Sequence, residues 1–468
     1  MKLYAAALNF RPIAEEFSVP TDFSAQLHTE AAHAKDRFAD QRIDRRDIEL
    51  VTIDPKGSMD LDQAVCIKKT VQGFRVFYAI ADVAAFIAPG TALEAESFRR
   101  GQTIYLPDEP ARLHPEEISE GAASLLPEVD RPAVLWTFDL DDKGEVTGNS
   151  VERALVRSRA RLDYVEVQED FEKGRLHPSI ALLPAVGKLR QESALRRSAV
   201  NLRLPSQRVE RRDDGRYELE LEPRLEVMEW NSEISLLTGM VAGQMMAAAG
   251  VGVLRTLGPA DEKALRTFAV EAQALGFGYE PKQPVGEFIA GLDVTTNAGM
   301  AVMREAQKLL RGADYDVLHG APGEEDVHAG VGGYYAHVTA PLRRLVDRFA
   351  TETCLAIAAG IDVPEWVSSR YEELVETMRS SGTTASNVDR ACLRLTEATV
   401  LAPHVGEDFE AVVLATQPEK DKCRIFIAEP PMLCGCSGSP EEATQVTVRL
   451  EDANIADRTV TFRWPSSH

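Results

Sequence analysis

The stretch Val51-Thr-Ile-Asp-Pro-Lys-Gly-Ser-Met-Asp-Leu-Asp-Gln-Ala64 decides how the rest of the chain is interpreted. Its first three residues are all β-branched and predict a short strand. The segment Pro55-Lys-Gly-Ser58 then supplies the residues of a turn. Asp60 and Asp62 lie two positions apart, so on an extended segment their side chains leave the same face. Asp54 is expected to approach them from across the turn.

Three carboxylates in one loop have a physical consequence. They repel one another unless a cation lies among them. Hard divalent cations such as Mg²⁺ prefer all-oxygen sites of this kind. The loop therefore predicts a metal site at Asp54, Asp60 and Asp62. For this spacing alone, a solvated acidic loop is an equally good interpretation.

The overall composition is that of an ordinary globular protein. The chain has 468 residues, of which 44% are hydrophobic and 27% charged, enough for two or more domains. Its six cysteines are too few for a disulfide scaffold and indicate a reducing compartment. The apolar start is too short for a signal peptide, and no run approaches the roughly 20 residues of a membrane span. These features predict a cytoplasmic protein without membrane segments.

The net charge of −22 bears on possible partners. Taken alone it argues against a nucleic-acid binder, because contacts to phosphate need lysine and arginine. Cations that line one groove can still create a local positive field. Arginines do cluster at Arg99-Arg100, Arg157/Arg159/Arg161 and Arg343-Arg344, so the charge permits a nucleic-acid partner without predicting one.

Hydrophobic periodicity divides the chain into three parts. Residues 1–46 form a polar N-terminal segment with a helical pattern around 25–40. Residues 47–402 are predicted to form one large domain, with strands at 73–82, 133–140 and 148–157 followed by helices. The helices are expected at 261–275, 301–310, 341–359, 370–378 and 386–399. This pattern predicts an α+β fold with a mixed β-sheet core and helices on one side.

Residues 403–468 are predicted to form a second, smaller domain. Short strands at 409–414, 423–427, 444–450 and 458–464 follow one another at the spacing of a small barrel. An OB-type barrel fits, and such barrels often hold single-stranded nucleic acid. Any other small β-barrel fits the pattern equally well. Cys434-Gly-Cys436, with Cys423 nearby, lacks the paired spacing of a usual zinc site.

The order of several sequence blocks resembles the ribonuclease II/R family, whose catalytic part is the RNB domain. The aspartate stretch is similar to the metal-binding loop of that family. The most specific partner is Tyr335-Ala-His-Val-Thr-Ala-Pro-Leu-Arg-Arg-Leu-Val-Asp347, about 280 residues further on. Intervening similar blocks are Ala79–Val83, Arg100–Pro107, Ser124–Arg131 and Arg157–Tyr164. The resemblance is to a short form, without recognisable cold-shock barrels before the catalytic domain.

The resemblance implies a 3′-to-5′ exoribonuclease that hydrolyses single-stranded RNA to nucleoside 5′-monophosphates with Mg²⁺. In this family pattern Asp54, Asp60 and Asp62 hold metal, and Arg343 stabilises charge on the phosphoryl group. The residues expected to contact RNA are Tyr105, which stacks on the terminal base, Tyr164 and Glu233, which lie near the riboses, and Arg344. Asp82 and His337 are better explained as structural residues.

One departure from the family pattern bears directly on the metal site. Gln63 stands where the family has a fourth aspartate, so a neutral amide oxygen is expected to be a weaker metal ligand there. Two hypotheses follow: an active metal-dependent exoribonuclease, or a catalytically weak or inactive RNB-domain protein that binds RNA. A phosphatase acting on small nucleotides is a more remote third. No small organic cofactor is indicated, and the physiological RNA, substrate length, oligomeric state and protein partners are not readable from the sequence.

Overall fold

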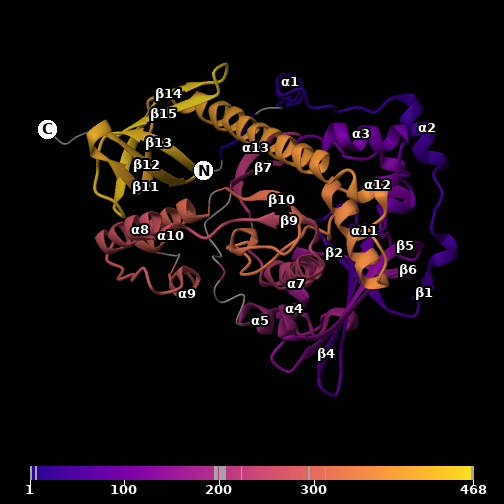
Figure 1. Cartoon of the computed structure of the whole chain (residues 1–468). Coiled ribbons are helices and arrows are strands. Elements are labelled where there is room, and N and C mark those ends of the chain that lie inside the picture. The colour runs from indigo at the N-terminus through magenta and orange to yellow at the C-terminus, as the bar shows by residue number, and fades with distance from the viewer. Residues whose placement is uncertain are drawn as a thin grey trace.

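The computed structural model describes residues 3–5, 8–193, 199, 207–222, 224–293, 296–310 and 312–464. Two parts are evident, a large domain built on a curled sheet and a small C-terminal barrel (Figure 1). The long helix α13 (Tyr371–Leu401) runs between them. The fold class predicted from the sequence, an α+β domain followed by a small barrel, is therefore confirmed.

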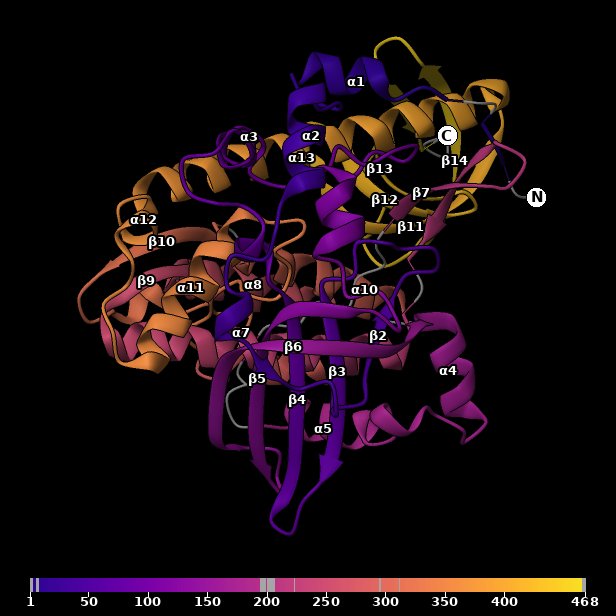
Figure 2. The same cartoon turned by 90° about the vertical axis from the view of Figure 1, so that its right-hand side faces the viewer.

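The large domain is organised around a six-stranded sheet. Its strands are β1 (Ile43–Asp44), β2 (Leu50–Asp54), β3 (Gln63–Lys69), β4 (Gly73–Ala81), β5 (Asp130–Asp141) and β6 (Val146–Asp163). The order is β1-β6-β2-β3-β4-β5, and β6 also pairs with β5. The first half of β6 lies antiparallel to β5, whereas its last residues run parallel to β2. The sheet therefore curls until its two ends meet in one long strand (Figure 2).

Alternation along the strands sends side chains into two cores. On β4, Val76, Tyr78 and Ile80 join one apolar cluster, whereas Ala79 and Ala81 join the other. This is the two-residue period of a strand buried on both faces. The first cluster is covered by the helices α4 (Tyr164–Glu172), α5 (Leu183–Gln191) and α7 (Glu226–Ala249). Shorter helices, α2 (Ala25–His33) and α3 (Ala92–Arg100), contribute to the second cluster.

The remaining elements of the large domain flank these layers. They are α1 (Arg11–Glu16), β7 (Gln207–Arg211), β8 (Tyr217–Leu221), β9 (Val251–Thr256), α8 (Glu262–Ala274), α9 (Val285–Ala290), α10 (Asn297–Ala306), β10 (Asp314–His319), α11 (Leu345–Ala359) and α12 (Glu365–Ser368). Asp261 caps α8 as predicted, because its carboxylate accepts a hydrogen bond from the Ala264 amide at 2.7 Å.

Two helix predictions need correction. The segments 370–378 and 386–399 belong to the single 31-residue helix α13, which continues through Gly382. Conversely, the helix predicted from Pro341 begins only at Leu345. Residues 340–344 form turns instead, and the amide of Leu342 is hydrogen-bonded to Asp62 rather than within a helix. That contact is the centre of the candidate site.

The C-terminal strands close into the expected barrel. They are β11 (Asp408–Gln417), β12 (Lys422–Ala428), β13 (Pro431–Ser437), β14 (Gln445–Asn454) and β15 (Thr459–Arg463), in the order β11-β12-β13-β15-β14. The sequence analysis missed β13, whose proline and glycine weaken the strand pattern. Cys423 and Cys436 face each other across β12 and β13 as buried thiols. In the part of the chain that the structure describes, no helix has the length and apolar character to cross a bilayer.

Asp82 follows β4 and has the structural role predicted for it. Its carboxylate is buried and accepts from Arg42 at 2.9 Å and from Arg153 at 2.6 Å. Arg153 also pairs with the buried Glu352. The network joins the N-terminal segment, β6 and α11, and Asp82 is the carboxylate that Arg42 and Arg153 share.

We expect Asp82→Asn to lower the free energy of unfolding by about 3–5 kcal/mol, because two buried guanidinium groups lose their shared counter-ion. Denaturant unfolding at neutral pH measures this. Asp139→Asn is the matched control, since Asp139 pairs with Arg75 on the exposed surface and its loss costs less than about 1 kcal/mol. Equal effects of the two variants would contradict the role of Asp82.

Candidate active site

The aspartate loop follows β2 as the sequence predicts. Asp54 is the last residue of β2, and the amide of Ser58 donates to the Pro55 carbonyl at 3.1 Å to close a turn. Gly57 in this turn has φ +88°, a region that glycine enters without strain. The chain then passes through Asp60 and Asp62 into β3. The three carboxylates thus come from the end of one strand and the start of the next.

Two side chains that the sequence analysis did not single out fasten this loop. The Ser124 hydroxyl donates to the Met59 carbonyl at 2.6 Å and accepts from the Leu61 amide at 3.0 Å, so it binds the backbone on both sides of Asp60. Arg161 donates to the Ser58 carbonyl at 3.1 Å. Ser124 opens one of the blocks that resemble the ribonuclease family, and this was the only signal pointing to it.

The second half of the site is the turn that carries Arg343. The amide of Leu342 donates to Asp62 Oδ1 at 2.8 Å, and Arg343 Nε lies 3.8 Å from Asp62 Oδ2. The guanidinium of Arg343 is 42% exposed. The predicted partner of the aspartates therefore does lie beside them, with room to reach a ligand from solvent.

Arg344, which was predicted to contact RNA, lies mostly inside the protein. Its guanidinium makes two hydrogen bonds of 2.9 Å to the carboxylate of Asp347, and its side chain is 15% exposed. Asp347 also accepts the amide of Ala340 at 2.7 Å. In this conformation Arg344 holds the turn in shape through Asp347.

Burial and mutual repulsion set the electrostatics of the three aspartates. Burial is the main cause that raises the pKa of Asp54 to about 7, and the nearby Asp60 carboxylate adds to it. Burial also raises the pKa of Asp60, and raises that of Asp62 well above its usual value. Arg343 lowers the pKa of all three. All three carboxylates therefore interact electrostatically with the Arg343 guanidinium.

The donor set partly fits a divalent cation. Asp54 Oδ2 is buried and has no hydrogen-bond partner among the described residues, which is the state of an oxygen that lacks a cation. However, among the residues with described positions, no three His, Cys, Asp or Glu side chains gather tightly enough to hold a metal by themselves. The three carboxylates therefore do not enclose a cation by themselves. Mg²⁺ often binds in this way, through one or two carboxylates completed by water and substrate phosphate.

Gln63, predicted as a weak metal ligand, has its amide engaged elsewhere. Its nitrogen donates to the Thr339 carbonyl at 2.6 Å, and its oxygen accepts from the Tyr78 hydroxyl at 2.6 Å. The side chain links β3 to the residues just before Arg343. It does not present a free oxygen to the aspartates in this conformation.

Tyr105 is brought to the site by backbone pairing. The Thr103 amide donates to the Arg343 carbonyl at 2.9 Å, which aligns the two segments. The side chain of Tyr105 is 53% exposed, unusual for a large aromatic residue. Burial of its hydroxyl raises its pKa, with a further contribution from Asp60. Tyr105 therefore stands at the rim with its ring open to solvent.

The other predicted contacts lie deeper. Tyr164 begins α4, accepts a hydrogen bond from Asn231 at 3.0 Å, and has its pKa raised to about 12 by burial and by Asp54. Glu233 is buried on α7, at 4% exposure. His337 pairs with the Tyr315 hydroxyl at 2.8 Å, and burial lowers its pKa well below the usual value, which fits the structural role predicted for it.

Comparison with protein families and known proteins gives consistent matches. The RNB domain matches residues 42–353, and the C-terminal S1 domain of RNase II-type exonucleases matches residues 407–464. Ribonuclease R of Chlamydia trachomatis is 25% identical over 436 residues, which cover 88% of this chain and 61% of that protein. Ribonuclease R of Escherichia coli is 41% identical over 127 residues, 27% of this chain and 16% of that one. The chain thus spans less than two thirds of the length of these relatives.

Solved structures share the fold at low sequence identity. RNase R of Mycoplasma genitalium, in complex with ribose methylated single-stranded RNA, superimposes with a TM-score of 0.86 at 16% identity, covering 98% of this chain and 78% of that one. Yeast Ssd1, described as a pseudonuclease, gives a TM-score of 0.66 at 13% identity, covering 90% of this chain and 52% of that one. The same fold is therefore present in proteins with different activities.

The raised pKa of Asp54 predicts pH-dependent cation binding. A divalent cation binds the ionised carboxylate, so raising the pH through about 7 favours binding, by up to about tenfold per pH unit below that value. Titration of the protein with Mn²⁺ at pH 6, 7 and 8 measures this. Asp54→Asn should weaken binding and flatten the dependence, whereas Asp139→Asn should leave both unchanged. An affinity that is constant from pH 6 to 8 in the wild type would contradict the assignment.

Proposed function

The chain belongs to the RNB-domain family of ribonucleases, and from this membership we propose that it is a 3′-to-5′ exoribonuclease. Its substrate is single-stranded RNA, its products are nucleoside 5′-monophosphates, and its cofactor is Mg²⁺. Residues 47–402 form the catalytic domain in this proposal, and residues 403–468 form an accessory barrel. The family assignment supports the reaction class, and the side chains of the site support the activity of this member.

The observation that carries the proposal is the meeting of Asp62 with Leu342 and Arg343. Residues 280 positions apart are joined by a 2.8 Å hydrogen bond, which places an exposed guanidinium beside a buried carboxylate group. A protein that only needs a stable fold gains nothing from holding one buried and two half-buried carboxylates that repel one another. A phosphodiesterase needs both charges, because it must hold a cation and an anionic phosphate together.

Each residue has a defined task in the proposed reaction. When bound by Asp54, Asp60 and Asp62, Mg²⁺ supplies a Lewis acid for the phosphate and an acidified water. Arg343 donates to the non-bridging phosphate oxygens, where negative charge accumulates as the bond to the leaving oxygen breaks. Ser124 keeps Asp60 in place through the backbone on either side of it. In this proposal the carboxylates act on the phosphate through the cation that they hold, and Arg343 contacts the same phosphate directly.

Two tyrosines account for selection of RNA. The exposed ring of Tyr105 offers a stacking surface that accepts any base. The phenol of Tyr164 accepts a hydrogen bond from Asn231, so its own proton can be donated to a ribose hydroxyl near Asp54. Glu233 is buried, and the Arg344 guanidinium is paired with Asp347, so neither is assigned a direct contact with RNA here. The single-stranded RNA held by the Mycoplasma enzyme of the same fold is consistent with this choice of substrate.

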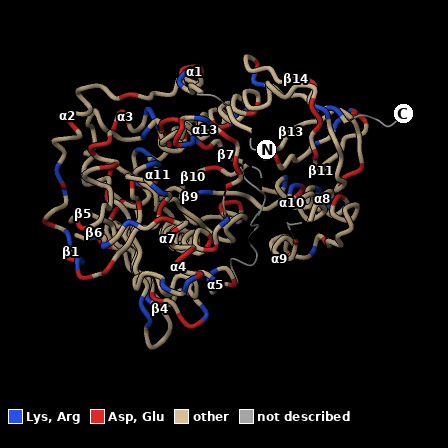
Figure 3. Tube along the Cα trace, turned by 180° about the vertical axis from the view of Figure 1, so that it is seen from behind, with Lys and Arg blue, Asp and Glu red and all other residues tan. Residues whose placement is uncertain are grey.

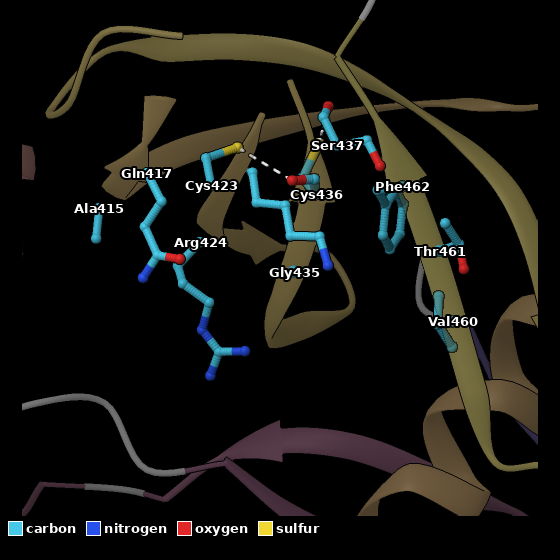
Figure 4. Close-up of a pocket in the computed structure, with 11 residues that line it drawn as sticks. Ala415, Gln417, Cys423, Arg424, Gly435, Cys436, Ser437, Val460, Thr461 and Phe462 are labelled. Carbon is cyan, nitrogen blue, oxygen red and sulfur yellow. Dashed lines mark hydrogen bonds between the residues drawn. The ribbon is translucent and has the colours of Figure 1, made fainter. Parts of the chain in front are cut away.

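The barrel offers a second contact for longer RNA. Lys and Arg alternate with Asp and Glu over the whole molecule, so the net negative charge is not gathered in one part (Figure 3). On the barrel, a cavity of about 360 Å³ opens between β12, β13 and β15. Lys422 and Arg424 are exposed at its edge, and Phe462 lies buried at its base. Arg424 and Gln417 point to the same open side (Figure 4). We assign this surface to RNA phosphates.

The compartment proposed is the cytoplasm. All six cysteines are buried free thiols, which suits a reducing environment. The alternative function, an RNA-binding protein with little or no nuclease activity, is favoured by one observation: Gln63 replaces an acidic residue, and its oxygen is not directed at the aspartates. The fold shared with a pseudonuclease shows that both outcomes are compatible with this architecture.

Incubation of 5′-end-labelled single-stranded RNA with the protein decides between the two functions. The proposal predicts a ladder that shortens from the 3′ end with Mg²⁺, release of nucleoside 5′-monophosphates, and no cleavage with EDTA. RNA that is bound but not shortened supports the non-catalytic alternative. Cleavage that continues in EDTA would show that the metal assignment is wrong.

Arg343→Ala should reduce single-turnover cleavage by about 10³–10⁵-fold, the loss seen when a charge-stabilising arginine is removed from phosphoryl transfer. RNA affinity should change little, because many other contacts hold the strand. Arg75→Ala is the control, since Arg75 is an exposed arginine on β4 paired with Asp139. A loss below about tenfold in Arg343→Ala would mean that Arg343 is structural.

The double variant Lys422→Ala/Arg424→Ala should weaken binding of long RNA but not of a short oligonucleotide that reaches only the catalytic domain. The slope of log affinity against log salt should fall by about 0.7 for each phosphate that the variant no longer neutralises. Arg449→Ala is the control, because Arg449 lies on β14 and forms an exposed ion pair with Asp408 of β11. An unchanged slope would show that this face of the barrel does not bind RNA.

A further inference from the structure

Gln63 is the first residue of β3 and follows directly on Asp62. Both ends of its amide are engaged. The nitrogen donates to the Thr339 carbonyl at 2.6 Å, and the oxygen accepts from the Tyr78 hydroxyl at 2.6 Å. The Ser235 hydroxyl completes a triangle, 2.7 Å from the Tyr78 oxygen and 3.4 Å from the Gln63 oxygen. One side chain thus ties β3 to β4, to α7 and to the turn before Arg343.

The chemistry of the partners fixes the orientation of this amide. A backbone carbonyl can only accept a hydrogen bond, so the group facing Thr339 must be the NH₂. The hydroxyls of Tyr78 and Ser235 can donate, so the carbonyl oxygen of Gln63 must face them. Tyr78 and Thr339 are buried, at 1% and 5% exposure, and water cannot easily replace these bonds. The oxygen is therefore occupied by protein donors.

A carboxylate cannot do the same work at this position. Ionised Glu has no proton to donate, so one of its oxygens would face the Thr339 carbonyl and repel it. Asp is one methylene shorter and cannot span from Tyr78 to Thr339. Gln at this point therefore supplies a donor that an ionised Asp or Glu lacks.

The turn that Gln63 holds is the one that carries Arg343. The Thr339 carbonyl accepts a hydrogen bond from the Gln63 amide, and the Leu342 amide donates to the carboxylate of the neighbouring Asp62 at 2.8 Å. The Ala340 amide between them is held by Asp347 at 2.7 Å. Three side chains thus restrain three of the four residues immediately before Arg343. Two of those side chains belong to adjacent residues of the aspartate loop.

We propose that Gln63 is a positioning residue that fixes the Thr339–Arg343 turn against the aspartates, and that it is not a metal ligand. Asp54, Asp60 and Asp62 are then the whole protein contribution to cation binding. The part of the proposal that concerns turnover rests on the proposed ribonuclease function, because it acts through Arg343. The part that concerns the turn and the cation does not depend on activity.

Hydrogen exchange on the full-length protein tests the restraint without any reaction. Gln63→Met keeps the length of the side chain and removes both hydrogen bonds. Exchange in the peptide that covers residues 339–345 should rise by about tenfold, the effect of losing a buried hydrogen bond, while peptides from β5 and β6 stay unchanged. Tyr78→Phe, which leaves the bond to Thr339 intact, should give a smaller rise. Gln244→Met, an exposed residue on α7, is the control. Unchanged exchange in 339–345, or a rise across the whole sheet, would overturn the proposal.

Titration of the RNA-free protein with Mn²⁺ tests the second half. Gln63→Met should bind Mn²⁺ within about twofold of the wild type if Gln63 is not a ligand. A loss of about tenfold or more would show that Gln63 coordinates the cation. Asp60→Asn, which removes a carboxylate from the loop, serves as the positive control for weakened binding.

A double-mutant cycle links the turn to turnover. Gln63→Met alone should slow single-turnover RNA cleavage by about 10–100-fold, because a small displacement of a catalytic group is enough for such a loss. In the Arg343→Ala background the same change should cost less than about threefold, since both substitutions then affect one function. Losses that multiply would overturn the claim that Gln63 acts through Arg343. If the wild type cleaves no RNA, the ribonuclease function fails, and hydrogen exchange and Mn²⁺ binding still decide the role of Gln63.

Discussion

The hydrogen bond from the Leu342 amide to the Asp62 carboxylate is the contact on which the rest of the site depends. It joins two segments 280 residues apart and fixes the amide of Leu342 in the turn that precedes α11. The exposed guanidinium of Arg343 thereby lies beside the buried carboxylate of Asp62. Neither segment forms the site by itself. In the aspartate loop alone the carboxylates repel one another, and in the turn alone the Arg343 guanidinium has no carboxylate beside it.

This arrangement also bears on how an acidic protein could bind the acidic polymer proposed as its substrate. Burial raises the pKa of all three aspartates, which means that their ionised forms are destabilised. A cation bound among them would stabilise the ionised forms. Arg343 supplies one positive charge beside Asp62, and the proposed divalent ion would supply the rest. The overall charge of −22 therefore matters less than the positions of a few cations around one phosphate.

Much of this could be predicted from the sequence, and the failures have definite physical causes. The aspartate loop was recognisable because turn residues and β-branched residues act locally, and the barrel was recognisable from alternation, except for β13. The helix start near Pro341 was misplaced because a partner 280 residues away decides it. The hydrogen bonds of Gln63 could not be predicted, because its partners Tyr78 and Thr339 meet it only in the folded chain. Family resemblance identified the RNB domain but not the roles of these hydrogen bonds. The presence of the same fold in a nuclease and in a pseudonuclease shows why these side-chain contacts are needed to infer activity.

The central claim is that the aspartate loop and the Arg343 turn act on one phosphate. A crystal structure of the protein with Mn²⁺ and a single-stranded RNA whose terminal phosphodiester resists hydrolysis tests it most directly, because the anomalous signal of manganese locates the ion. We expect Mn²⁺ to be bound by carboxylates from among Asp54, Asp60 and Asp62 together with the last phosphodiester, and the Arg343 guanidinium to contact the same phosphate. RNA whose 3′ end lies elsewhere, or manganese away from these carboxylates, would contradict it.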